Sequence, residues 1–141
     1  MKFLLDTNVL SDVRHPKGDP AVKARVGRLE SANIFTSCIV LSELVRGVAR
    51  LDDGTRKREL ADWLTTLSNQ FADRILPVDA AVATRWGRIV AKCEESGFKP
   101  GAADGLIGAT TLEHGMILVT RNVRDFQPMA VEMWSPWERG L

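Results

Sequence analysis

The chain opens on an apolar run that ends at an acidic residue. Phe3, Leu4 and Leu5 precede Asp6, and a Thr-Asn pair then leads into further apolar residues. An apolar run without alternation is typical of a strand covered on both faces of a parallel sheet. Open parallel sheets bind their ligands at the carboxyl ends of their strands. We therefore expect Asp6 to lie where chemistry takes place.

Strands alternate with helices along the rest of the chain. Short apolar runs predict four more strands, at residues 33–37, 74–78, 116–119 and 130–133. Apolar residues spaced three and four apart predict helices at about residues 7–13, 20–30, 39–51, 55–71, 80–95 and 102–114. Asp19 followed by Pro20, and Asp79, supply helix-starting signals. The pattern predicts an α/β fold with a parallel sheet and right-handed crossovers, in one domain spanning residues 1–141.

Three local features refine this scheme. Pro77 has no backbone N–H to donate, so the third predicted strand is expected at a sheet edge. Residues 120–126 are interpreted as a polar loop after the fourth strand. Trp134 and Trp137 fall in a C-terminal tail, where packing in the core or in a dimer is favoured over stacking on nucleic-acid bases.

The composition is that of an ordinary globular domain, with 45% hydrophobic and 26% charged residues. A net charge of +1 argues neither for nor against a nucleic-acid partner. Cys38 and Cys93 lie among apolar neighbours without metal-ligand spacing, and they are interpreted as small buried thiols in a reducing compartment. No stretch approaches the roughly 20 apolar residues that cross a bilayer, and Asp6 interrupts the first run too early for a signal peptide. A cytoplasmic protein without membrane contact is expected.

Four carboxylates stand at related places in the predicted fold. Asp6 ends the first strand, and Glu43 lies near the start of the helix after the second. Asp104 is in the first turn of the helix before the fourth strand, and Asp125 is in the loop after that strand. Each alone has an ordinary interpretation, as a helix cap, a surface ion pair or a turn residue. If the first, second and fourth strands are neighbours, however, all four meet at one edge of the sheet.

Carboxylates gathered in this way indicate a hard divalent cation. Close carboxylates repel one another, and their pKa values rise unless a cation neutralises them. Oxygen ligands without His or Cys favour Mg²⁺ or Mn²⁺. Such an ion activates water and stabilises an in-line displacement at phosphorus. The pattern therefore predicts metal-dependent hydrolysis of a phosphate ester.

The segments that carry these carboxylates resemble those of the PIN-domain ribonucleases, and more narrowly the VapC-type toxins of bacterial toxin–antitoxin pairs. The matching segments are residues 4–10, 42–47, 103–109 and 119–126, and they occur in order along essentially the whole chain. The resemblance implies a three-layer α/β/α fold with a five-stranded parallel sheet in the order 3-2-1-4-5. It also implies cleavage of RNA with Mg²⁺ or Mn²⁺, a homodimer, and a cognate antitoxin protein that silences the nuclease by wrapping its groove.

The resemblance also assigns roles to individual residues. The metal-binding and water-activating role falls to four carboxylates, Asp6, Glu43, Asp104 and Asp125. Thr120 matches the hydroxyl residue that orients them, and Asn122 matches a supporting polar position. Thr7 and Asn8 match the turn that fixes the first aspartate. The role of Asp125 varies most within the family and is exerted there either directly or through water.

Three arginines are candidates for contact with RNA phosphates: Arg46, Arg121 and Arg124. Arg121 and Arg124 belong to the loop that carries Asp125, which favours a functional role. For Arg46 a solvated helix face is an equally good interpretation.

Other functions remain open at this point. A non-catalytic RNA- or protein-binding module on a nuclease-like fold would lack a carboxylate-dependent Mn²⁺ site. A phosphatase of the haloacid-dehalogenase type would need a second Asp where Asn8 stands. A receiver-like signalling domain would use an Asp after the third strand, where Asp79 lies, but it also needs a Lys after the fifth strand, and no Lys follows Lys99.

Overall fold

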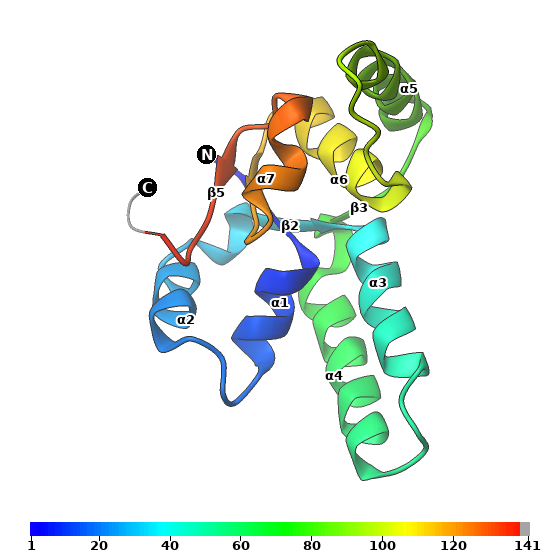
Figure 1. Ribbon diagram of the computed structural model, residues 1–141. Helices are drawn as coiled ribbons and strands as arrows, with labels where there is room; N and C mark the ends of the chain where they lie inside the picture. The colour runs from blue at the N-terminus through cyan, green and yellow to red at the C-terminus, as the bar shows by residue number, and fades with distance from the viewer. Residues whose placement is uncertain (139–141) are drawn as a thin grey trace.

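The computed structural model describes residues 1–138. Within these residues it forms a five-stranded parallel sheet with helices on both faces (Figure 1). The strands are β1 (Phe3–Leu5), β2 (Ile34–Ser37), β3 (Ile75–Leu76), β4 (Ile117–Val119) and β5 (Met133–Trp134). They lie in the order β3-β2-β1-β4-β5, which confirms the predicted fold class and strand order.

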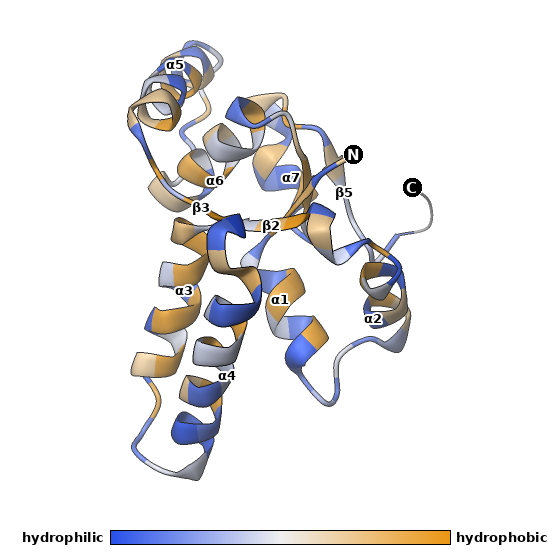
Figure 2. Cartoon of the chain, turned by 180° about the vertical axis from the view of Figure 1, so that it is seen from behind, coloured by the Kyte–Doolittle hydropathy of each residue, from blue (hydrophilic) through white to orange (hydrophobic). Residues whose placement is uncertain are grey.

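The helices form two layers, one on each face of the sheet, and two of them form a hairpin that projects from it. They are α1 (Thr7–Arg14), α2 (Pro20–Gly27), α3 (Cys38–Ala49), α4 (Thr55–Phe71), α5 (Ala80–Glu95), α6 (Ala102–Glu113) and the single-turn α7 (Val123–Phe126). Figure 1 shows α5, α6 and α7 above the sheet and α1, α2 and α4 below it. Helices α3 and α4 run side by side away from the sheet, and α4 presents mainly hydrophilic residues on the side seen in Figure 2.

Strand β1 is the centre of the hydrophobic core. It pairs with β2 on one side and with β4 on the other, so that Phe3 is opposite both Ile34 and Ile117. Leu4 is fully buried, as is Leu118 on β4. Each such side chain contributes about 1.5–3 kcal/mol on burial. The apolar run before Asp6 is therefore a central strand, as its pattern predicts, and it holds that carboxylate on a rigid element.

The predicted helix starts are confirmed by side-chain caps. Asp19 accepts a hydrogen bond from the Ala21 N–H at 2.8 Å, with Pro20 in the first turn. Asp79 accepts one from the Val82 N–H at 2.9 Å. These bonds satisfy N–H groups that have no partner inside their own helix.

Some predicted boundaries are wrong. The third strand is limited to two residues, so Pro77 follows it, although β3 is the edge strand expected. The fifth strand lies further along than predicted, because it is positioned by pairing with β4, where Val119 is opposite Trp134. Trp134 is therefore a buried strand residue whose ring meets Phe3 edge-on at 6.3 Å, and not part of a tail. The expected loop after β4 contains α7, and the second helix ends at Gly27.

Both cysteines are free thiols. Cys93 is buried as predicted, whereas Cys38 is partly exposed at the start of α3. None of the helices within residues 1–138 is long and apolar enough to cross a bilayer.

Candidate active site

Asp6 stands at the junction of β1 and α1. Its backbone N–H donates to the Val119 carbonyl at 3.0 Å, which continues the pairing with β4. Its Oδ1 accepts from the Thr7 N–H at 2.8 Å and caps α1. Only 4% of the residue is exposed. The carboxylate is thus fixed by the strand before it and by the helix after it.

The second carboxylate oxygen of Asp6 is held by side chains from two segments. Thr120, fully buried directly after β4, donates from Oγ1 to Asp6 Oδ2 at 2.7 Å. The Thr120 oxygen also accepts from the Asn122 N–H at 3.0 Å, which directs the hydroxyl proton toward Asp6. Asn8 adds a bond of 3.3 Å from Nδ2 to the same oxygen. Thr120 and Asn8 therefore both restrain this oxygen of Asp6.

Asn8 also joins the two sides of the site. While its Nδ2 donates to Asp6, its Oδ1 accepts from the Arg121 N–H at 3.1 Å. The amide therefore ties the first turn of α1 to the segment between β4 and α7. Asn122 supports this segment through its backbone, and its side chain is exposed.

Glu43 reaches the site from α3. It lies in the second turn of the helix, slightly further along than predicted, because α3 begins at Cys38 with Ser37 as its cap. Its Oε1 accepts from Thr7 Oγ1 at 2.8 Å. Thr7 consequently contacts two of the four carboxylates, Asp6 through its N–H and Glu43 through its hydroxyl.

The remaining two carboxylates approach from the opposite layer. Asp104 is in the first turn of α6, as predicted, and Asp125 is in α7. Burial raises the pKa of Asp104 to about 6, and the negative charges of Asp6, Asp125 and Glu43 add to this rise. Burial also raises the pKa of Asp6 above 3.8, against the lowering effect of its hydrogen bonds and with a further rise from Glu43. The structure thus brings the other three carboxylates within electrostatic reach of Asp104.

The donor set fits a hard divalent cation. Carboxylate and hydroxyl oxygens surround the site, and the raised pKa values of Asp6 and Asp104 indicate that their ionised forms are disfavoured, which a bound cation would relieve. The two histidines lie at the C-terminal ends of α1 and α6. Within residues 1–138, however, no three Asp, Glu, His or Cys side chains are close enough to hold one ion as they stand.

Two of the three predicted RNA-contact arginines lie beside the carboxylates. Arg121 and Arg124 line a hollow of about 470 Å³ together with Asp125. Arg46 is exposed on α3, one turn beyond Glu43, and lies outside this hollow. The Arg121 guanidinium stands over the ring of Trp137, 5.0 Å from its centre. The sequence did not predict this pair, because nothing in residue spacing brings these two positions together.

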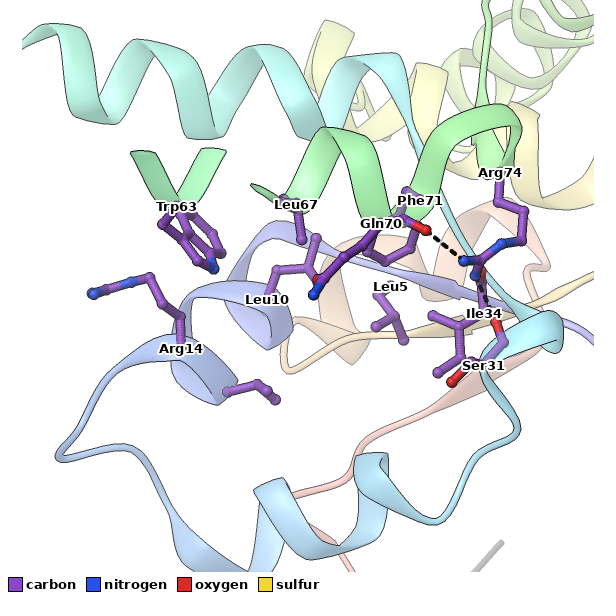
Figure 3. Close-up of a pocket in the computed structure, with 11 residues that line it drawn as sticks. Leu5, Leu10, Arg14, Ser31, Ile34, Trp63, Leu67, Gln70, Phe71 and Arg74 are labelled. Atoms are coloured by element: carbon purple, nitrogen blue, oxygen red, sulfur yellow. Dashed lines mark hydrogen bonds between the residues drawn. The ribbon is translucent and has the colours of Figure 1, made fainter. Parts of the chain in front are cut away.

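A second concave region lies between α1 and α4 (Figure 3). It has a volume of about 750 Å³ and an apolar floor that includes Leu10, Leu67 and Phe71, and none of the predicted site residues lines it. At one end Arg74 donates to the carbonyls of Ser31, Ile34 and Gln70 at 2.5–2.7 Å, which ties the end of α4 to β2.

At the other end of this region Arg14 stands over the ring of Trp63 at 5.5 Å. The same two residues also line a smaller hollow of about 260 Å³ that reaches Thr7 and Glu43. The apolar region between α1 and α4 therefore adjoins the carboxylates. No pattern in the sequence marks this connection, since it depends on how α4 packs against α1.

Comparison with known proteins gives a consistent result. The model of the PIN domain family matches residues 3–131. The chain is 36% identical over 136 residues to the toxin FitB of Neisseria gonorrhoeae, covering 96% of this chain and 98% of that protein. It is 31% identical to the VapC ribonuclease Y4jK of Sinorhizobium fredii, with 96% and 98% covered. Among solved structures, FitAcB from Neisseria gonorrhoeae contains a chain that superimposes with a TM-score of 0.92 at 35% identity, covering 97% of this chain and 99% of that one.

Proposed function

We propose that this protein, which belongs to the PIN-domain family, is the endoribonuclease toxin of a toxin–antitoxin pair and hydrolyses RNA with a bound Mg²⁺ or Mn²⁺. Membership rests on the family model, which spans most of the chain, and on the relatives that match almost end to end. The observation that carries the proposed chemistry is the buried carboxylate of Asp6, which Thr120 and Asn8 orient beside Glu43 and Asp104. Mutually repelling carboxylates gathered around a buried one destabilise a fold, so their presence points to a function.

The residues of the chain divide the work as follows. Asp6, Glu43, Asp104 and Asp125 would hold the ion. An ion held by them would lower the pKa of a bound water molecule and would offset charge on the phosphodiester. Thr120 and Asn8 restrain one oxygen of Asp6, while Thr7 restrains Glu43, so that the side chains are positioned before substrate arrives. Arg46 remains a predicted RNA contact, and no other side chain among residues 1–138 anchors it.

The structure offers reasons against the alternatives. Asn8 donates to Asp6 and accepts from Arg121, which is a positioning role that the nucleophilic chemistry of a haloacid-dehalogenase phosphatase does not need. Asp79 caps α5 and is engaged there, in contrast to the phosphoacceptor of a receiver domain. A non-catalytic module would have no use for a partly buried Asp104 whose pKa is raised by burial and by the charges of three other carboxylates.

The antitoxin partner is supported by the solved relatives, which include a toxin–antitoxin complex from Klebsiella pneumoniae. The apolar region between α1 and α4 is the surface that suits such a partner, because it continues past Arg14 and Trp63 to Glu43. A segment seated there would reach the carboxylates and block RNA. The homodimer, the cytoplasmic location and the single domain spanning residues 1–141 remain predictions.

The central test is RNA cleavage by the purified protein. We expect labelled single-stranded RNA to be cut with Mg²⁺ or Mn²⁺ and to remain intact in EDTA. Asp6→Asn should abolish cleavage while the protein stays folded, because the substitution is isosteric and removes the charge. Asp62→Asn is the matched control, since this exposed residue of α4 is far along the chain from the site segments. Cleavage in EDTA, or equal activity of Asp6→Asn, would contradict the proposal.

A further inference from the structure

We propose that the hollow beside Asp125 is an RNA subsite in which Arg121 and Arg124 bind a phosphate adjacent to the scissile bond, with Trp137 holding Arg121 in place. This inference rests on the proposed function and adds a binding site to it. We call the hollow the arginine pocket. Its lining consists of Arg121, Asn122, Val123, Arg124, Asp125, Gln127 and Glu138.

The arginine pocket is continuous with the carboxylates. Asp125 lines it and is also one of the charges that raise the pKa of Asp104. On the other side, the Arg121 N–H bonds to Asn8, which in turn bonds to Asp6. At about 470 Å³ the pocket is within the size range of sites that hold small organic ligands, and one nucleotide belongs to that class. A strand of RNA cut at the carboxylates therefore has its neighbouring nucleotide at this pocket.

The two guanidinium groups in the pocket are available to a ligand. Asp125 and Glu138 line the same hollow, yet within residues 1–138 neither arginine forms a salt bridge with them; the salt bridges found there join Lys57 to Asp53 and Arg85 to Glu113. Arg121 and Arg124 are both exposed. A guanidinium binds phosphate oxygens through two parallel N–H groups, which makes arginine the side chain suited to a phosphodiester.

Trp137 prepares Arg121 for this contact. The guanidinium lies 5.0 Å from the centre of the indole ring, within the range of a cation–π interaction. Because the ring restrains the guanidinium, the Arg121 side chain has less rotational freedom to lose when it binds. Trp137 is itself anchored, since Arg25 on α2 donates to the Pro136 carbonyl at 2.7 Å. Trp137 is thus a positioning residue that acts through Arg121.

The ligand chemistry favours a phosphodiester over the carboxylates of a protein partner. The pocket adjoins the groups that would act on phosphorus, and phosphate contacts set the register of a nucleic acid without reading its sequence. An acidic protein segment is the competing occupant, and the experiment below includes it.

The test measures RNA binding as a function of salt. In an Asp6→Asn background, which prevents cleavage, a labelled single-stranded RNA of about ten nucleotides is titrated with Mn²⁺ present and anisotropy gives Kd. Each phosphate contact to a single strand contributes about 0.7 to the slope of log affinity against log salt. We expect Arg121→Ala and Arg124→Ala each to lower the slope by about that amount and to weaken binding about 5- to 10-fold. Arg88→Ala, an exposed arginine on α5, should leave both unchanged.

Trp137 needs variants that separate positioning from stability. Trp137→Leu should raise KM for cleavage several-fold without changing kcat, and Trp137→Phe should retain most of the affinity, because a ring face remains. Combined with Arg121→Ala, Trp137→Leu should weaken binding no further, since it acts through that arginine. Thermal unfolding identifies any variant that fails to fold. If the Trp137 variants fail to fold, Arg124→Ala still tests the arginine pocket.

The outcomes distinguish the two proposals. If the wild-type protein fails to cut RNA with either ion, the proposed function fails. If it cuts RNA but the arginine variants keep the wild-type salt slope and KM, the subsite is refuted. Loss of affinity for an acidic peptide with unchanged affinity for RNA would also refute it, in favour of a protein ligand.

Discussion

Replacing Thr120 by Val tests how strongly the fold depends on holding Asp6. Valine has the shape of threonine, so the buried space stays filled while the hydroxyl is lost. Asp6 Oδ2 then loses its 2.7 Å bond, and the Asn122 N–H loses its acceptor at 3.0 Å. Asn122 is exposed and can bond to water in its place, whereas the buried carboxylate cannot. The loss of stability therefore comes from the Asp6 carboxylate, which is left without this hydrogen bond.

A hydrogen bond to a charged group contributes about 1.5–3 kcal/mol, so we expect the free energy of unfolding to fall by about 2 kcal/mol at pH 8 in EDTA. The sign of the pH dependence follows from the same bond. The Thr120 hydroxyl lowers the pKa of Asp6, whose pKa in the folded protein is already above 3.8, so Thr120→Val raises it further. The loss of stability relative to wild type is complete at pH values above the pKa of Asp6 in the variant. It becomes smaller as the pH falls through that pKa.

Urea unfolding at pH 8 and pH 4 measures the effect, and Thr111→Val is the matched control. Thr111 is equally buried, but its hydroxyl donates to the Ile107 carbonyl at 2.8 Å, an acceptor that does not titrate. Thr111→Val should lower the free energy of unfolding by less than Thr120→Val does at pH 8, and by the same amount at both pH values. If both variants lose equal stability at both pH values, the hydroxyl does not stabilise ionised Asp6 and the reasoning is refuted.

Three further predictions concern stability. The pKa of Asp104 is raised to about 6, so the ionised carboxylate destabilises the fold fully above pH 6 and not at all below pH 4. In urea unfolding, Asp104→Asn should therefore be more stable than wild type at pH 8 and equal to it at pH 4. We expect a gain of about 1 kcal/mol, because solvent screens this partly exposed side chain. Gly105→Ala places a Cβ 2.7 Å from Trp86 Nε1 and should cost about 1–3 kcal/mol in the same assay, whereas Gly87→Ala, with open space, should gain about 0.5–1 kcal/mol. Arg74→Met removes three bonds to carbonyls and should lower stability by about 2 kcal/mol; an unchanged urea midpoint would contradict this role.

The order of elements and the central strand followed from local patterns. The apolar run before Asp6 identified β1, and the aspartates at positions 19 and 79 identified two helix starts, because these signals act over a few residues. The hydrophobic pattern did not locate the short strand near the C-terminus correctly. Strand β5 has two residues, too few for periodicity, and its pairing with β4 decides where it lies.

The candidate site likewise has a part that the sequence predicted and a part that it did not. Its four carboxylates were identified from residue type and place in the chain, together with the resemblance of the surrounding motifs. Their hydrogen bonds were not, because Thr7 and Glu43 are 36 residues apart and Thr120 and Asp6 are 114 apart, and such contacts exist only once the strands are ordered in the sheet.

What local sequence decided is therefore the alternation of strands and helices and the identity of the acidic side chains, since both depend on neighbours along the chain. Only the folded chain decided the burial that raises the pKa of Asp104, the position of the Arg121 guanidinium over the Trp137 ring, and the apolar region between α1 and α4. Desolvation, charge proximity and concavity are properties of groups that meet in space. No spacing in the sequence specifies them until the sheet order has placed those groups side by side.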